Sequence, residues 1–527
     1  MISQLNILLF IFVSTPFVGR LGNTAQLSAI GLAGSFANVA GMSLMWGLST
    51  GAETLGSQAW GAGNKKRLGL ICQRAFLIGL MAVLPCWTVY LNVAPILGLL
   101  KQDAEVIHYV NLYIYGFLPA LPLTALYIAV MKFLQTQQVV LPVVFAGLLA
   151  NGFNLLFHYV FINVLDLGLL GAAFSTDLTI LIFALSMLLY IRVKNLHREC
   201  WGGWTKECLN GWGEYLRLAV PGMFMICLEW WAFEIGMITT GLLGKEYLAA
   251  NTLCLNFGAY AYLILSGVQI ASIILVGNYL GEGSGAKAMT IARVSLFWGF
   301  LFFGTLFFVV FFVLNEQLPY ILTDDETVIQ LTAESLKVVA VMQAVDSIVN
   351  VTSGILKGAG KQTFGAVTNF FGYYFIGLPV GVSLMMSWGA DMKVPGYWWG
   401  QVIGLSVQSF VYISYLTCKI NWDKTAAQAA KLASVPSADP IPTADGKADD
   451  DEGGGGDEPK IASRPNHLVK LIVIVVFLAT FIASFIHSTL HHRIGLRFNS
   501  TELSHSVTTN PPLNSTDPEN ANSTLFL

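Results

Sequence analysis

The feature that most constrains this chain is its succession of long apolar segments separated by short polar ones. A helix needs about 20 mostly apolar residues to cross the hydrocarbon of a bilayer. Only 11% of the 527 residues are charged, which is too few to cover soluble domains of that total length. We therefore expect an all-α polytopic membrane protein. Its predicted spans are residues 2–19, 28–50, 69–91, 108–132, 141–163, 168–191, 216–240, 248–275, 288–314, 328–356, 364–387, 396–418 and 468–486.

The basic residues of the loops predict the orientation of these spans, because Lys and Arg accumulate on the cytoplasmic side of a membrane. With the N-terminus inside, most loop Lys and Arg are cytoplasmic, and we count Lys132 and Lys357 among them. The outer loops between the first twelve spans contain few basic residues: Arg20, Lys101, Lys245 and Lys393. The N-terminus is thus predicted to be cytoplasmic and the C-terminus, after thirteen spans, extracellular. Because the first span starts almost at Met1, we expect it to be a truncated helix.

The C-terminal region supports an odd number of spans. Residues 424–467 are rich in Ala, Pro, Gly and Asp, so we expect a disordered acidic cytoplasmic segment. Residues 468–487 form the predicted thirteenth helix, and 488–527 form a tail. That tail contains three N-x-S/T glycosylation motifs, which are modified only on the extracellular or lumenal face. Their acceptors are Asn499, Asn514 and Asn522.

A glycine-rich segment occurs twice. Residues 47–63 resemble residues 267–283 when the two segments are aligned without a gap. We therefore expect two six-helix lobes, residues 1–193 and 216–423, joined by a cytoplasmic linker, 194–215. Repeats of six spans share one topology and are related by a pseudo-two-fold axis along the membrane normal. Halves that rock about a central cavity are typical of secondary transporters, whereas a channel or an intramembrane enzyme does not require them.

Two carboxylates lie near the middle of predicted spans, Glu229 in the seventh and Asp346 in the tenth. A carboxylate inside a membrane is costly and usually lines a cavity with a function. No Lys or Arg is expected at similar depth, so each group would hold either a proton or a cation, which is the logic of an exchanger. Trp230 offers an aromatic face to an organic cation, although such rings also simply pack. Glu53 and Glu334 are interpreted as solvated helix ends.

Glu234 follows Glu229 by five residues, which is about 140° around a helix. We therefore expect that both cannot point squarely into one cavity, and that Glu234 forms an interhelical hydrogen bond instead. For Asp177, in the outer half of the sixth span, a structural and a functional interpretation remain equally open. No ATP-binding loop, metal motif or paired catalytic groups are evident, so the sequence favours ion-driven transport over an enzyme.

The chain resembles the multidrug and toxin extrusion (MATE) family, and its animal branch in particular, over residues 3–425 and the thirteenth helix. The resemblance depends on four features together: the repeated glycine segment, Trp201-Gly-Gly-Trp204-Thr-Lys-Glu-Cys208-Leu, Cys227-Leu-Glu-Trp-Trp-Ala-Phe-Glu234 and Gly354-Ile-Leu-Lys-Gly-Ala-Gly360-Lys-Gln. It implies an exporter in the plasma membrane that exchanges protons for organic cations and xenobiotics, without a cofactor, metal or nucleic acid. We expect the transport unit to be a monomer. The runner-up is a sodium-coupled drug exporter of the same fold.

The same resemblance implies roles for individual residues. Glu229 matches a substrate and proton site, and Glu234 matches an acidic position important for transport. Asp346 falls where relatives carry glutamate, so its reach is one methylene shorter. The complete set of predicted substrate- and proton-binding residues is Glu229, Asp346, Glu234, Trp230, Gln4 and Asn38.

Overall fold

The computed structural model describes Val13, Phe17, Val18, residues 24–386 and residues 389–434. Throughout this part, the regular elements are α-helices, short 3₁₀ turns and π-helical turns, and no strand occurs. The predicted all-α class is therefore confirmed for it. Most of the first predicted span, Gln4, the thirteenth helix and the three glycosylation motifs lie outside the described residues.

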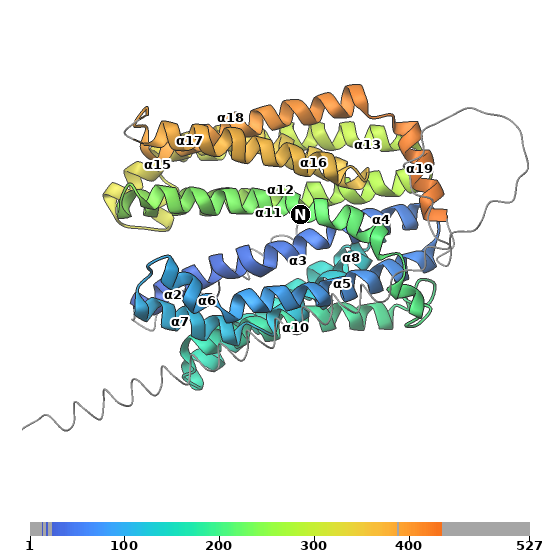
Figure 1. The fold of residues 1–527 in the computed structure, drawn as a ribbon, viewed down its shortest axis with the longest axis horizontal. Coiled ribbons are helices and arrows are strands. Elements are labelled where there is room, and N and C mark those ends of the chain that lie inside the picture. Colours follow the sequence, from blue (N-terminus) through green and yellow to red (C-terminus); the bar gives the residue numbers. More distant parts are fainter. Residues whose placement is uncertain (1–12, 14–16, 19–23, 387–388, 435–527) are drawn as a thin grey trace, which may run out of the picture.

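The N-terminal bundle is an antiparallel array that ends at Val193 (Figure 1). Its elements are α2 (Thr24–Ala37), the π-turn η1 (Asn38–Met42), α3 (Ser43–Leu48), α4 (Thr50–Gly61), α5 (Lys65–Leu91), α6 (Val93–Leu99), α7 (Ala104–Gly116), α8 (Ala120–Thr136), α9 (Leu141–His158), η2 (Tyr159–Val164) and α10 (Gly168–Val193).

A linker with one 3₁₀ turn leads to the C-terminal bundle, which lies beside the first (Figure 1). The elements from the linker onward are η3 (Lys206–Leu209), α11 (Trp212–Gly241), α12 (Lys245–Gly281), α13 (Gly285–Trp298), η4 (Gly299–Gly304), α14 (Thr305–Val313), η5 (Pro319–Ile321), α15 (Glu326–Gly358), α16 (Gln362–Phe370), η6 (Phe371–Gly377), α17 (Leu378–Met385), α18 (Lys393–Ser414), η7 (Tyr415–Lys419) and α19 (Trp422–Ser434).

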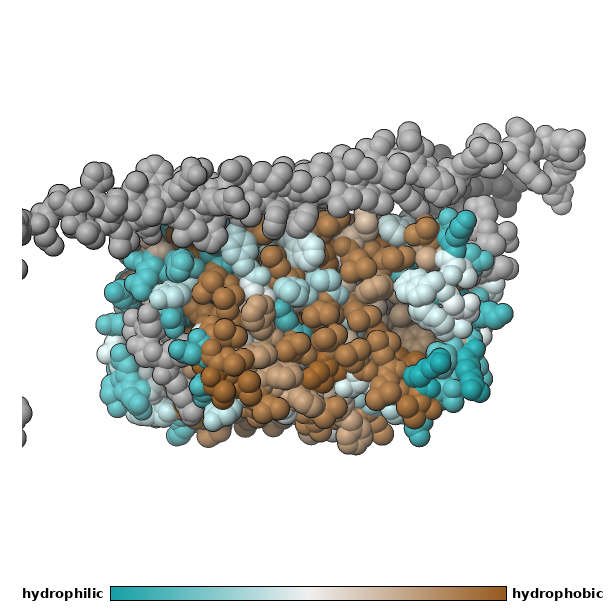
Figure 2. All heavy atoms as spheres, turned by 90° about the horizontal axis from the view of Figure 1, so that it is seen from below, coloured by the Kyte–Doolittle hydropathy of each residue, from teal (hydrophilic) through white to brown (hydrophobic). Residues whose placement is uncertain are grey.

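The distribution of hydrophobic residues over the surface indicates that the molecule is embedded in a membrane. Figure 2 shows a broad hydrophobic belt with hydrophilic residues at both ends. Among the described residues, nine helical stretches are long and apolar enough to cross a bilayer, and α7 with α8 forms a tenth that is bent by 49°. The predicted span 396–418 forms α18 and η7 but is not among these nine. The chain is therefore a multi-pass membrane protein.

The two glycine-rich segments fold alike. α4 ends at Gly61 and α5 begins at Lys65, while α12 ends at Gly281 and α13 begins at Gly285, so both helix boundaries fall at aligned positions. Gly63 and Gly283 take positive φ angles of 74° and 84°, which favour glycine because it has no Cβ. The backbone hydrogen bonds also correspond. For example, Gly63 N donates to the Trp60 carbonyl and Gly283 N to the Leu280 carbonyl, each at 3.0 Å.

These two helix ends also cross each other. A Cβ on Gly61 would lie 1.9 Å from the Asn278 carbonyl oxygen, and a Cβ on Gly281 would lie 2.0 Å from that of Gln58. We call Gln58, Gly61, Asn278 and Gly281 the glycine crossing. Gln58 and Asn278 also occupy aligned positions in the two segments. The contact of Gly61 with Asn278 therefore corresponds to the contact of Gly281 with Gln58. The missing side chains let α4 and α12 pack backbone to backbone there.

The glycine crossing lies at the end of the molecule where α4, α12 and α15 finish, which we call the basic end. Its loops and helix ends contain Lys65, Lys66, Lys194, Arg198, Lys206, Lys287, Lys361, Lys419 and Lys424. The amphipathic α19 packs there against α12, α13 and α4. The Asn64 side chain donates a hydrogen bond of 2.9 Å to the Ala433 carbonyl, so α19 contacts both bundles.

Candidate functional site

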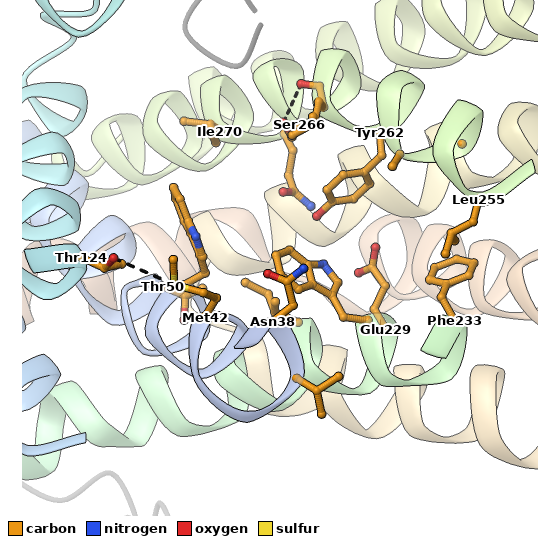
Figure 3. A pocket seen from close by; sticks show the side chains of 18 of the residues that line it. Asn38, Met42, Thr50, Thr124, Glu229, Phe233, Leu255, Tyr262, Ser266 and Ile270 are labelled. Carbon is orange, nitrogen blue, oxygen red and sulfur yellow. Dashed lines mark hydrogen bonds between the residues drawn. The ribbon is translucent and has the colours of Figure 1, made fainter. Parts of the chain in front are cut away.

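A cavity of about 470 Å³ lies between the bundles, which is a usual size for a small-molecule site. The N-terminal bundle lines it from η1, α3, α4, α8, α9 and α10, and the C-terminal bundle from α11, α12, α15 and α18. Figure 3 shows Asn38, Glu229 and Tyr262 pointing into this space from three separate helical elements. Residues from both bundles thus meet at one site.

The two predicted mid-membrane carboxylates, Glu229 and Asp346, both line this cavity. Each belongs to a long helix, α11 or α15, and lies well inside it. They are close enough for their charges to repel each other. Beside them, Tyr262 and Trp230 also line the cavity, and their side chains interact with each other. Because two neighbouring ionised carboxylates repel each other, binding of a proton or a cation between them is favoured.

Glu234 lines the same cavity as Glu229, although the angle of about 140° between them on α11 keeps both from pointing squarely into it. The contributing positions of α11 are Ile226, Glu229, Trp230, Phe233 and Glu234, which follow the three- and four-residue spacing of one helix face. The two glutamates lie at opposite edges of this stripe, and the cavity is wide enough to meet both. Glu234 also interacts with the Ser35 side chain of α2, which is an interhelical polar contact of the kind expected.

Aromatic rings form much of the wall. On the side of the C-terminal bundle, the ring centroids of Phe233 and Trp398 are 6.3 Å apart. On the opposite side, Tyr127 packs against Phe183 at 4.8 Å and against Trp46 at 6.1 Å, the latter edge to face. An organic cation between these walls would meet ring faces as well as carboxylates, and both attract positive charge.

Toward the basic end, the cavity contains charges that we had predicted to lie in loops or at solvated helix ends. Lys132 is only 2% exposed within α8 and forms an ion pair with Glu53, which is 5% exposed in α4. Lys357, in the last turn of α15, is 4% exposed and interacts electrostatically with Glu53 and Glu229. The loop assignments of both lysines and the solvated assignment of Glu53 are therefore wrong.

Asp346 and Lys357 are eleven residues apart in α15, about three full turns, so they share one helix face. Hydropathy did not indicate this shared face, because a lysine at the edge of an apolar run is interpreted as the start of a loop. The eleven-residue spacing from Asp346 is the signal that could have placed Lys357 beside the cavity. Three turns of helix still separate Lys357 from Asp346 in depth, so Lys357 acts on the carboxylates only through its electrostatic interaction with Glu229.

The remaining candidate residues lie at different places in the structure. Asn38 lines the cavity from the π-turn η1. Glu334 is exposed on α15, as predicted. Asp177 is buried in α10 away from the cavity lining, and neither of its carboxylate oxygens has a hydrogen-bond partner in the described part of the chain. No group of three or more His, Cys, Asp and Glu side chains able to hold a metal occurs among the described residues.

Comparison with known proteins decides the family. The sequence model of the MatE family matches residues 1–160 and 221–383. The human multidrug and toxin extrusion protein 1 is 38% identical over 432 residues, which is 82% of this chain and 75% of the human protein. The chain belongs to the multidrug and toxin extrusion family. The mouse multidrug and toxin extrusion protein 2 is 36% identical, over 84% of this chain and 76% of its own.

Solved structures agree with this family assignment. The eukaryotic MATE transporter AtDTX14 superposes with a TM-score of 0.77 at 25% identity, covering 82% of this chain and 96% of that one. A mutant of the Vibrio cholerae MATE transporter VcmN has the same fold, with a TM-score of 0.70 at 19% identity over 82% of this chain and 95% of its own. The protein is thus a membrane transporter and not an enzyme.

Proposed function

We propose that this chain is a plasma-membrane antiporter that exports organic cations and xenobiotics in exchange for protons. The observation that carries the proposal is the meeting of Glu229 and Asp346, from different helices, on one aromatic-walled cavity between the bundles. The human relative is named for multidrug and toxin extrusion, which agrees with such a cargo. Glu234, Trp230 and Asn38 complete the proposed binding set among the described residues.

The charge inventory of the cavity favours a cationic cargo. Its lining contains four carboxylates, those of Glu53, Glu229, Glu234 and Asp346, and two ammonium groups, those of Lys132 and Lys357. Two positive charges against four negative ones leave a net charge of −2 when all are ionised. A proton taken up by Glu229 or Asp346 removes one negative charge and weakens the hold on the cation. Competition between protons and organic cations for the same carboxylates would couple proton transport to cation transport.

We further propose that the bundles are two lobes related by a pseudo-two-fold axis and that they move by alternating access. The equal boundaries and equal turns of the two glycine-rich segments support the axis. The glycine crossing and α19 close the basic end, which we assign to the cytoplasm by its Lys and Arg. The structure would then represent an outward-facing state, from which the lobes rock to open the basic end.

The proposal is tested by uptake of tetraethylammonium into cells that express the full chain. With the cell interior more acidic than the medium and sodium absent, we expect gradient-driven uptake by the wild type. Glu229→Gln should abolish it, because the amide can neither release a proton nor attract the cation. Glu334→Gln is the matched control, since it makes the same change at an exposed position of α15 and should transport like the wild type.

Surface expression is measured for every variant, so that a lost signal reports transport. No uptake by wild-type chain at the cell surface would refute proton-coupled export for this cargo class. Uptake that requires sodium, and that a pH gradient alone does not drive, would instead establish the runner-up, a sodium-coupled exporter of the same fold.

A further inference from the structure

A second cavity, of about 360 Å³, lies in the N-terminal bundle near the basic end, away from the central one. Its walls come from α5, α8, α10 and the linker between the bundles. Most of the lining is apolar or aromatic: Phe76, Phe133, Leu188, Ile191, Trp201 and Trp204. Trp204 is 59% exposed, so this wall continues onto the surface of the molecule.

The linker wall is held firmly against α5. A Cβ on Gly69 would lie 2.0 Å from the Cys200 carbonyl oxygen, so the two backbones are in direct contact. The Gln73 side chain donates a hydrogen bond of 2.8 Å to the Gly203 carbonyl. Between these points Trp201 meets Trp204 edge to face, with centroids 5.4 Å apart. The linker wall of the cavity is thus held in place by direct contacts with α5.

Two polar side chains on the lining have unused capacity for polar interactions among the described residues. Arg192, in the last turn of α10, contacts the His197 ring, with Nη1 and Nε2 3.3 Å apart. No carboxylate of the described chain forms an ion pair with Arg192. Gln73 is 2% exposed, and its Oε1 atom has no hydrogen-bond partner within the same residues. The lining therefore offers a cation, Arg192, to an anion.

We propose that this cavity binds one anionic phospholipid of the inner leaflet. The acyl chain would occupy the apolar and aromatic part, and the phosphate would pair with Arg192 beside His197. This assignment rests on the proposed orientation, in which the basic end faces the cytoplasm, where anionic lipids are concentrated. Trp and Tyr are likewise enriched where a membrane meets water.

The test is lipid retention by the purified full chain, measured by native mass spectrometry. The chain is titrated with phosphatidylserine or with phosphatidylcholine of the same acyl composition. We expect one tightly held phosphatidylserine and no equally tight phosphatidylcholine. Arg192→Gln should weaken that binding about tenfold, as expected for the loss of one charge-assisted contact. Trp204→Ala should weaken it by removing part of the wall.

Arg198→Gln is the matched control, because Arg198 is a neighbouring exposed base that does not line the cavity. It should retain the lipid like the wild type. Equal binding of the two lipids would overturn the proposal. So would an equal effect of Arg192→Gln and Arg198→Gln, which would indicate diffuse attraction to a basic surface. Because the experiment measures lipid binding, its outcome does not depend on whether the uptake assay shows proton coupling.

Discussion

At the scale of single residues, the buried ion pair between Lys132 and Glu53 is the least expected feature. Both side chains are more than 90% buried, on α8 and α4. Lys132 also lies 5.4 Å from the centroid of the Trp46 ring, so its charge has two favourable neighbours. A buried pair of this kind gains little over an apolar pair, but breaking it leaves one charge without compensation.

Lys132→Met should therefore destabilise the protein by about 3–5 kcal/mol, because it removes the ion-pair partner of the buried Glu53 carboxylate and leaves it only the electrostatic interaction with Lys357. The double variant Glu53→Gln with Lys132→Met should recover most of that loss. Unfolding of the purified protein in mixed detergent micelles measures both. Lys66→Met serves as the control, because Lys66 is exposed and should tolerate the change. If the single variant were as stable as Lys66→Met, the pair would not be a structural contact.

The sequence was sufficient to find the acidic residues of the site but not their counter-ions. Glu229 and Asp346 stood out by their depth in apolar segments. Lys132 and Lys357 did not, because α8 and α15 continue past the apolar runs that define the predicted spans. That Glu234 lines the same cavity as Glu229 was not foreseen, because the angle between two side chains on a helix does not reveal the width of the cavity that they face.

At the scale of elements, the glycine crossing determines how closely α4 and α12 approach. Gly61 and Gly281 place backbone where any other residue would place a side chain. Thr54 Oγ1 donates to the Lys357 carbonyl at 2.7 Å, and Gln58 Nε2 to the Gly358 carbonyl at 3.1 Å, so α15 joins the same contact. Three helices are thereby tied together at the basic end.

Gly61→Ala and Gly281→Ala should each destabilise the described state by about 1–3 kcal/mol, the usual penalty of overpacking. The new methyl group would collide with backbone, which cannot rotate away. The measurement is thermal unfolding of the purified protein, with Gly152→Ala as the control, since a Cβ there meets no atom of the described residues within 4 Å. An unchanged melting temperature in both crossing variants would mean that the helices do not pack this tightly.

At the scale of the whole molecule, the described helices agree with the apolar segments read from the sequence, because length and hydropathy alone decide what can cross a bilayer. The bend between α7 and α8 and the π-turns were not foreseen, since they depend on packing between helices. Topology remains a prediction, and it extends to the C-terminal tail outside the described residues.

That topology predicts that the tail is glycosylated at Asn499, Asn514 and Asn522 when the chain is made in animal cells. Treatment with an N-glycosidase should increase the mobility of the protein on a gel, and each Asn→Gln change should remove one step of that shift. Asn350→Gln, within α15, is the control and should change nothing. A tail that carries no glycan would argue for a C-terminus on the cytoplasmic side.

The duplicated segment also has a mechanical consequence. The helix that leads into the second copy, α12, is uninterrupted from Lys245 to Gly281, whereas the stretch of equal length that ends in the first copy is divided into α2, η1, α3 and α4. A continuous helix transmits torque along its whole length, while a π-turn or a break concentrates bending at one point. Strain between the bundles would therefore be absorbed at Asn38–Met42, directly beside the cavity, and α12 would act as the stiff lever.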